Sequence, residues 1–108
     1  MATMAVPLSA GKHAAWEEWI AELNGPRKAE FDDMNARLGL TEHSAHLQPT
    51  PDGNFLVIAR HEGPGGDGFL ANLASSDNEF DRWFLGSVAD VHEMDPSAGP
   101  PPPAVRKL

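Results

Sequence analysis

The chain has 108 residues, of which 41% are hydrophobic and 22% are charged, and this ordinary globular composition excludes a wholly disordered chain. Sixteen Asp and Glu residues against eight Lys and Arg residues give a formal net charge of -8, which argues against nucleic acid or an anionic membrane as a partner. The chain contains no cysteine, so disulfides, thiolate nucleophiles and cysteine-based metal sites are excluded.

The beginning of the chain predicts a strand followed by a long helical stretch. Residues 3–8 carry apolar side chains at every second position, as in a strand with one buried face. Ser9 then offers a hydroxyl that can cap a helix. Because residues 24–26 are Asn-Gly-Pro, residues 10–38 form either one bent helix or two helices in series. Their apolar side chains follow helical spacing: Trp16, Trp19, Ile20 and Leu23, then Phe31, Met34 and Leu38.

From residue 40 the apolar period falls to two, which predicts a β-hairpin. Its strands, residues 40–48 and 54–62, flank residues 49–53, whose prolines, aspartate and glycine favour a turn. A slip of one residue would exchange the two faces of each strand. If the loop closes symmetrically, the facing pairs are Leu47 with Phe55, Ala45 with Val57, His43 with Ala59 and Glu42 with Arg60.

The glycine-rich residues 63–68 lack the Lys-Ser/Thr of a phosphate-binding loop, so we interpret them as a connector. A short helix is predicted over residues 69–73. Ser76 and Glu79 have the spacing of a capping box, in which each side chain satisfies the other's backbone N–H. An amphipathic helix should follow this box, with apolar residues Phe80, Trp83, Phe84, Val88 and Val91.

The end of the chain has a different composition. The predicted helix ends near Met94, before Asp95-Pro96. A proline-rich segment, residues 96–103, then leads to residues 104–108, which form either a final edge strand or a loose basic tail.

The order of these elements predicts an α+β fold, the βαββαβ sandwich of the ferredoxin-like class, as a single domain over residues 1–108. Both main helices would cover one face of an antiparallel sheet. The other face would carry Leu40, Leu56 and Ile58, and such a face is commonly covered by a second copy of the chain, so we expect a homodimer. Residues 1–10 lack the basic and long apolar regions of a signal peptide, which favours a cytoplasmic location.

Several segments resemble the dimeric α/β-barrel superfamily, which includes the antibiotic-biosynthesis monooxygenases and the haem-degrading monooxygenases. The resemblance rests on Ala10-Gly11-Lys12 before a Trp-bearing helix and on residues 79–83, Glu-Phe-Asp-Arg-Trp. Residues 24–30, followed by Glu42, are similar to an uncharacterised branch of small barrel proteins. The resemblance implies two sheets packed face to face in a dimer, with a ligand pocket between sheet and helices in each subunit.

The resemblance raises the question of a haem. Trp83 and His92 look like the Trp and the axial His of the haem-degrading branch, and an imidazole can ligate iron. That branch also uses an Asn on its first strand, and residues 3–8 contain none. Trp83 and His92 are nine positions apart, which is about 2.5 helical turns. This separation places the two side chains on nearly opposite faces of the helix unless the helix breaks at Gly86. We therefore expect no haem or other cofactor.

A metal site formed by the hairpin histidines is also disfavoured. His43 and His46 point to opposite faces of a strand because they are three residues apart. His43 and His61 can share a face, but no third ligand accompanies them, and protein metal sites commonly need three or four.

Cofactor-free oxygenation or proton transfer on a small apolar or aromatic molecule is the remaining catalytic hypothesis. Histidine is the side chain that titrates near neutrality, so His43, His61 and His92 are the candidate bases. The alternative from another class is a non-catalytic ligand-binding or assembly protein. A catalyst should leave at least one histidine facing a cavity. Trp16, Trp19 and Trp83 are the candidate walls for an aromatic substrate, and Trp16, Trp83 and Phe80 would close the pocket of a binding protein. Large aromatics on a helix stripe more often belong to the core.

The remaining polar candidates are Arg27, Glu30, Glu42 and Arg60. Arg27 could hold a carboxylate or phosphate with two hydrogen bonds, oriented by one of the two glutamates. The interpretation we favour is an ordinary network of solvated ion pairs, which is the more common arrangement.

Overall fold

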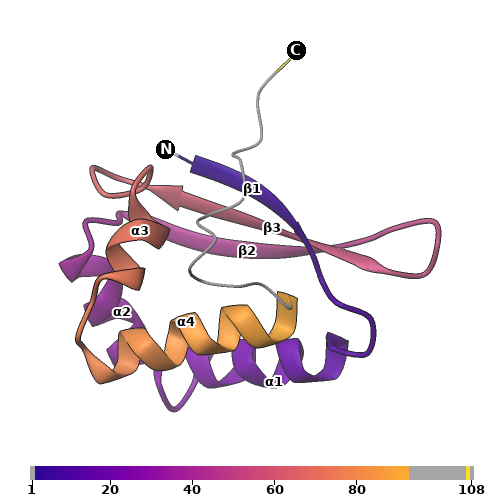
Figure 1. Cartoon of the computed structure of the whole chain (residues 1–108), viewed down its shortest axis with the longest axis horizontal. Helices are drawn as coiled ribbons and strands as arrows, with labels where there is room; N and C mark the ends of the chain where they lie inside the picture. The colour runs from indigo at the N-terminus through magenta and orange to yellow at the C-terminus, as the bar shows by residue number, and fades with distance from the viewer. Residues whose placement is uncertain (1, 93–106, 108) are drawn as a thin grey trace.

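The computed structural model describes residues 2–92 and 107, and in this part of the chain an antiparallel sheet packs against helices, so the fold is α+β as the sequence predicts (Figure 1). No helix in the described part is long and apolar enough to cross a membrane. The elements in chain order are β1 (Ala2–Pro7), α1 (His13–Asn24), α2 (Lys28–Arg37), β2 (Glu42–Pro49), β3 (Phe55–Glu62), α3 (Phe69–Ala74) and α4 (Glu79–His92).

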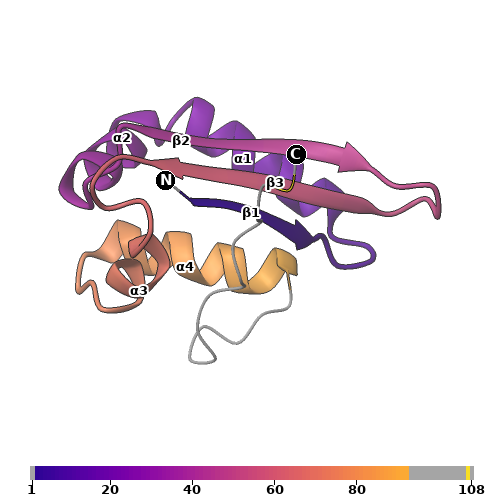
Figure 2. The same ribbon diagram turned by 90° about the horizontal axis from the view of Figure 1, so that it is seen from above.

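The sheet has the strand order β1-β3-β2, so β3 lies in the middle, and both strand pairs are antiparallel. β1 and β2 are not neighbours because the chain passes through α1 and α2 before it returns to the sheet on the far side of β3. Helices α1, α2 and α4 lie on one side of the sheet (Figure 1), with α1 and α2 toward the β2 edge and α4 toward the β1 edge (Figure 2). None of the described helices covers the other face.

Two helices occupy the stretch for which the sequence predicts one bent helix or two in series. They are separated by residues 25–27, and this turn contains Pro26, which has no backbone N–H to continue the helical pattern. The first helix begins at His13, with Lys12 at the capping position. Ser9 belongs to a separate turn before the helix, in which its carbonyl accepts the N–H of Lys12 at 3.0 Å. The predicted cap at Ser9 is therefore wrong.

β2 and β3 form the predicted hairpin with the register shifted by two residues. His43 lies opposite His61, whereas the sequence analysis paired it with Ala59. A shift of two leaves every side chain on its predicted face, since strand side chains alternate with period two. The face covered by the helices therefore carries His43, Ala45 and Leu47 from β2 and Val57, Ala59 and His61 from β3.

The loop chemistry explains the shift. The N–H of Thr50 donates to the carbonyl of Asn54 at 3.0 Å, so Asn54 faces Thr50, two residues later than the Gln48 partner that the symmetric loop predicts. The carboxylate of Asp52 accepts the N–H of Asn54 at 3.1 Å and the hydroxyl of Thr50, which stabilises this closure.

Asn78 caps α4. Its side-chain oxygen accepts the N–H of Phe80 at 2.9 Å and the N–H of Asp81 at 3.2 Å. The Ser76 hydroxyl accepts the N–H of Asn78 at 3.2 Å and donates to Asp81 at 2.6 Å. The predicted capping box of Ser76 and Glu79 is therefore wrong, since Glu79 is the first helical residue.

Two clusters of buried apolar side chains join the helices to the sheet. Leu40 belongs to the larger cluster and is 8% exposed, so its predicted place on the open sheet face is wrong. It lies in the turn that precedes β2, where strand alternation does not yet apply. The larger cluster comprises Leu23, Met34, Leu40, Phe69, Leu73, Phe80 and Phe84, and the smaller comprises Leu8, Trp16, Val57 and Val91.

A buried ion pair links α2 to α4. Asp81 is fully buried and accepts hydrogen bonds from the two Nη atoms of Arg37 at 2.9 and 2.8 Å. These bonds, with the one from Ser76, hold the pKa of the Asp81 carboxyl below its ordinary value. The pair fixes how the two helices meet beneath the sheet.

The glycine-rich segment contacts the end of α2 backbone to backbone. The N–H of Gly65 donates to the carbonyl of Gly39 at 2.9 Å. A Cβ atom on Gly65 would lie 1.8 Å from the carbonyl oxygen of Leu38, a distance that no side chain tolerates. Glycine is thus required here by close packing of a connector.

The predicted end of the last helix near Met94, the proline-rich residues 96–103 and the predicted final strand at 104–108 lie outside the described residues, apart from Lys107.

Candidate functional site

A cavity of about 330 Å³ lies between the sheet and the helices. Its walls come from all three strands and from α1, α2, α3 and α4, and most of the side chains are apolar or aromatic. The described lining residues include no Asp, Glu, Lys or Arg; their polar members are Asn24, Ser44 and three histidines. A concave site of this size and composition suits a small organic ligand. The largest side chains around it are Trp16, Trp19, Phe31, Phe69 and Phe84.

All three histidines that the sequence analysis selected as candidate bases line this cavity. His43 on β2 and His61 on β3 are cross-strand partners, and their rings meet edge to face with centroids 4.6 Å apart. The ring of Phe69 lies 5.0 Å from that of His43 and 4.6 Å from that of His61. The third, His92, lies at the end of α4. The two strands and α4 thus bring together side chains that are far apart in sequence.

His43 is a neutral imidazole with a defined tautomer. Its Nδ1 lies 2.8 Å from the side-chain oxygen of Asn35 on α2, so Nδ1 carries the proton and donates it. The Nε2 atom therefore keeps its lone pair. Burial, with a smaller contribution from the nearby ring of His61, lowers the pKa of His43 to about 3. This histidine is neutral at physiological pH and accepts a hydrogen bond at Nε2.

His61 is more deeply buried, with 3% of its surface exposed. Its Nδ1 atom has no hydrogen-bond partner among the described residues. Burial lowers the pKa of His61 to about 4. His61 is therefore a second neutral imidazole beside His43, with polar capacity that the described part of the protein does not satisfy.

His92 is oriented by the end of β1. Its Nδ1 atom donates to the carbonyl of Pro7 at 2.8 Å, which leaves the lone pair on Nε2. Burial lowers the pKa of His92, while the hydrogen bond to Pro7 acts in the opposite direction. The fixed tautomer makes Nε2 of His92 a proton acceptor at the cavity wall.

Two tryptophans of α1, Trp16 and Trp19, belong to the cavity wall. Trp16 is 5% exposed and packs with Leu8 and Val57, so it is also part of the core. Trp19 stacks obliquely on Phe84 with ring centroids 5.0 Å apart, and its buried indole N–H has no hydrogen-bond partner among the described residues. Of the wall residues that the sequence suggests, Trp16 and Trp19 line this cavity.

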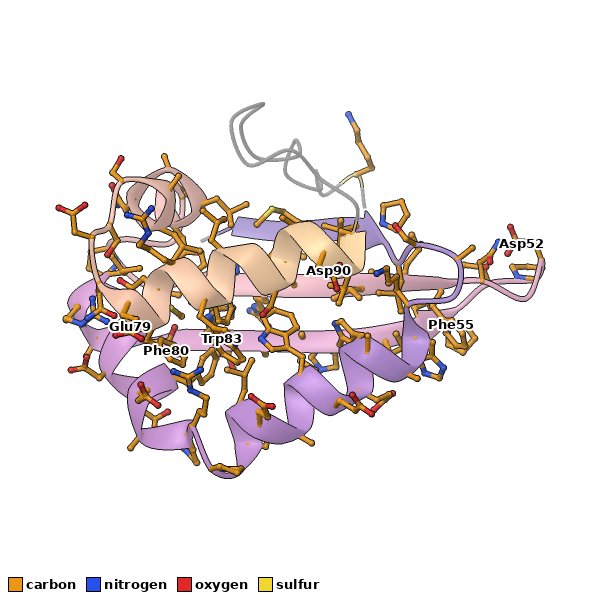
Figure 3. The ribbon with its side chains drawn as sticks, turned by 60° about the horizontal axis from the view of Figure 1, so that its bottom comes forward. Asp52, Phe55, Glu79, Phe80, Trp83 and Asp90 are labelled. Atoms are coloured by element: carbon orange, nitrogen blue, oxygen red, sulfur yellow. The ribbon has the colours of Figure 1, made fainter. Side chains whose placement is uncertain are left out.

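The other two predicted wall residues, Trp83 and Phe80, do not line this cavity. Figure 3 shows both on the side of α4 that faces α1 and α2. The Arg27 guanidinium lies over their rings, 4.1 Å from the centroid of Trp83 and 4.9 Å from that of Phe80. Arg27 also bonds Glu30 at 3.0 and 3.2 Å, so the two residues form an ion pair beside these rings.

Glu42 and Arg60 lie away from the cavity, on the sheet face that no described helix covers. Arg60 bonds Glu62 at 2.7 Å and lies 3.7 Å from Glu42. Because the register is shifted, Glu42 faces Glu62 across the strands and Arg60 lies between the two carboxylates. This group is a surface ion-pair network.

Trp83 and His92, the pair that a haem site would require, are not brought together. α4 runs from Glu79 to His92 without a break at Gly86, and His92 lines the cavity while Trp83 packs elsewhere. Among the described residues, no group of three or more His, Asp or Glu side chains is placed to hold a metal ion.

The sequence analysis missed Asn35, which sets the tautomer of His43. Nothing in its local pattern distinguishes Asn35 from other polar residues of a helix surface, because its partner comes from the next strand. The sequence analysis names Phe84 only as an apolar position and Phe69 only as the start of a short helix, although both rings contact that of His43.

No protein-family model, curated protein or solved structure matches the chain.

Proposed function

We propose that the protein binds a small, uncharged, largely apolar molecule in the cavity between its sheet and its helices. The observation that carries this proposal is a cavity of about 330 Å³ whose described lining contains aromatic rings and neutral histidines but no charged side chain. A charged ligand would lose its hydration there without gaining an opposite charge, at a cost of several kcal/mol or more. A neutral aromatic molecule would instead exchange water contacts for ring contacts.

The indole N–H signals in a ¹H–¹⁵N correlation spectrum test this proposal, because the chain has three tryptophans. Trp16 and Trp19 line the cavity and Trp83 does not. Titration with 2-naphthol should shift the signals of Trp16 and Trp19 and leave that of Trp83 nearly unchanged. Ala59→Leu, which adds volume to the cavity wall, should weaken binding, whereas Ala21→Leu on the exposed side of α1 should not. Equal shifts of all three signals would contradict the proposed site.

A second candidate function is cofactor-independent proton transfer, in which a base removes a proton from the bound ligand. If the resulting carbanion then reacts with molecular oxygen, the same site acts as a cofactor-independent oxygenase. The observation that favours it is His92, whose Nδ1–H is held by Pro7 so that Nε2 can accept a proton from an acidic C–H of the ligand. His43 and His61 are weaker candidates for this role, because burial lowers their pKa values to about 3 and about 4. A general base works best with a pKa near the working pH.

Hydrogen exchange of a neutral ketone separates the two candidates. With 2-tetralone in D₂O, a proton-transfer catalyst should accelerate exchange of the hydrogens next to the carbonyl, as followed by NMR. His92→Ala should abolish the acceleration, and His13→Ala, which changes a histidine outside the cavity, should retain it. Binding of 2-tetralone without acceleration would leave ligand binding as the function.

The proposal includes the ferredoxin-like βαββαβ sandwich and the homodimer of the dimeric α/β-barrel superfamily that the chain resembles. The described order β1-β3-β2, with α4 toward the β1 edge, supports the arrangement because a final strand could pair beside β1 (Figure 2). The uncovered sheet face bears the partly exposed Leu56 and Ile58. A second copy would bury these side chains.

Sedimentation equilibrium at micromolar concentration tests the dimer. The native chain should sediment with twice its monomer mass of 11.6 kDa, and Ile58→Asp should sediment as a folded monomer. A native chain that is monomeric throughout this range would contradict the dimer without affecting the cavity.

A further inference from the structure

His61 carries hydrogen-bonding capacity that the described protein leaves unused. The side chain is 3% exposed and lines the cavity, yet its Nδ1 atom has no partner. A neutral imidazole has one donor nitrogen and one acceptor nitrogen. Burial of such a group without hydrogen bonds is costly, so buried polar side chains nearly always have partners.

His43 adds a second acceptor next to it. Its Nδ1–H is used by Asn35, so Nε2 is the remaining acceptor, and the two imidazole rings are in contact at 4.6 Å. Together the histidines present two acceptor atoms and one donor atom. No carboxylate or cationic side chain of the described cavity lining competes for them.

We propose that His61 and His43 form the hydrogen-bonding anchor of the site, and that its ligands are uncharged aromatic molecules carrying a hydroxyl or N–H group. This inference rests on the proposed ligand-binding function. Within the histidine pair acceptors outnumber donors, so a ligand held by this pair should donate a hydrogen bond, whereas the unpartnered indole N–H of Trp19 on α1 is a separate donor of the lining. A ligand that only accepts hydrogen bonds would leave at least one imidazole lone pair buried and unpaired.

The rings around the histidine pair explain why the donor should sit on an aromatic skeleton. Phe31, Phe69 and Phe84 each lie 5.0 to 5.6 Å from the ring of His43. The ring of Trp19 in turn lies 5.0 Å from that of Phe84. Aromatic rings at these separations favour edge or offset contacts with a further ring. The aromatic wall and the polar anchor are therefore parts of one site.

Three naphthalene derivatives of similar shape test the anchor by calorimetric titration of the native protein at pH 7. 2-Naphthol is neutral and donates a hydrogen bond, 2-methoxynaphthalene is neutral and only accepts, and 2-naphthoate is an anion. We expect 2-naphthol to bind about tenfold more tightly than 2-methoxynaphthalene, the change that loss of one buried hydrogen bond produces. 2-Naphthoate should bind more weakly than both. Equal affinity for the two neutral compounds would overturn the anchor but not ligand binding, whereas failure of all three to bind would overturn the proposed function.

Substitution of His61 provides the second arm. His61→Phe keeps a ring and should reduce the preference for 2-naphthol over 2-methoxynaphthalene to less than about twofold, with 2-methoxynaphthalene binding retained. The matched control is His46→Phe, because His46 lies on β2 with its side chain exposed and outside the cavity. Retention of the full preference by His61→Phe would overturn the anchor. If the variant does not fold, the comparison of the two neutral compounds on the native protein still decides.

Discussion

Replacement of Arg37 by methionine should destabilise the protein strongly although Arg37 is partly exposed. The substitution keeps an unbranched apolar chain and removes the guanidinium that donates two hydrogen bonds to the buried Asp81. Loss of one partner from a fully buried pair costs about 3–5 kcal/mol. The Arg37 side chain is 35% exposed, so water reaches the vacated position in part, and we expect a reduced cost of about 2–3 kcal/mol.

The assay is urea unfolding followed by tryptophan fluorescence and circular dichroism. At an m value of about 1–3 kcal/mol/M, the expected loss lowers the unfolding midpoint by about 0.7–3 M. The matched control is Asp33→Asn, because Asp33 also bonds Arg37, at 2.8 Å, but is 64% exposed. An exposed pair of this kind contributes less than about 1 kcal/mol.

The same pair predicts a dependence of stability on pH. The pKa of Asp81 is lowered in the folded state by Arg37, whereas an unfolded aspartate titrates near 3.9. Its contribution is therefore fully present above about pH 4 and is lost as the pH falls through the lower folded value. Equal costs for Asp81→Asn and Asp33→Asn, or a cost below 1 kcal/mol for Arg37→Met, would refute the reasoning.

Three further predictions concern stability. Burial lowers the pKa values of His43 and His61 to about 3 and about 4, while an unfolded histidine titrates near 6.5, so their contribution to the free energy of unfolding is fully present above about pH 6.5 and falls as the pH drops toward 4. Urea unfolding midpoints measured across this range should show the decrease, and His61→Phe should make it smaller. Gly65→Ala should cost about 1–3 kcal/mol in urea unfolding, because its Cβ would lie 1.8 Å from a backbone carbonyl oxygen of the α2 end, whereas Gly68→Ala meets only a side-chain atom at 3.5 Å and should cost less. Asn78→Ala should lower the free energy of unfolding by about 1 kcal/mol and increase amide exchange in the first turn of α4, since it removes two capping bonds; unchanged exchange would argue against the cap.

The elements were predictable from the sequence because their signals are local. The stripe that includes Trp16 and Leu23 repeats at helical spacing, and the hairpin residues alternate at period two. The two-residue register shift was not predictable in this way. It depends on Asp52, whose side chain bonds both Thr50 and Asn54 and stabilises the closure of the loop by these two residues.

The capping of α4 shows a second limit. Ser76 and Asn78 are both residue types that cap helices, and they lie two residues apart. The Ser76 hydroxyl donates to the buried carboxylate of Asp81, and it is the side-chain oxygen of Asn78 that accepts the backbone N–H of Asp81 and caps the helix. Such a choice follows from tertiary packing and has no signal in the local pattern.

The candidate site was predictable in part. His43 and His61 were expected to share a face of the hairpin, and both line the cavity with His92. Trp83 was expected at the pocket but lies elsewhere, because the apolar stripe of α4 is wide enough to face both the sheet and the pair of helices α1 and α2. On the side that faces these helices, the guanidinium of Arg27 lies over the Trp83 ring. Asn35 was missed for the same reason, since its role depends on a strand partner.

A crystal structure of the protein with 2-naphthol tests the central claim most directly. We predict electron density for the naphthalene ring inside the cavity lined by Trp19 and Phe84, with the hydroxyl oxygen within hydrogen-bond distance of an imidazole nitrogen of His61 or His43. Side chains that fill the space between the sheet and the helices, or a ligand bound only on the outer face of the sheet, would contradict it.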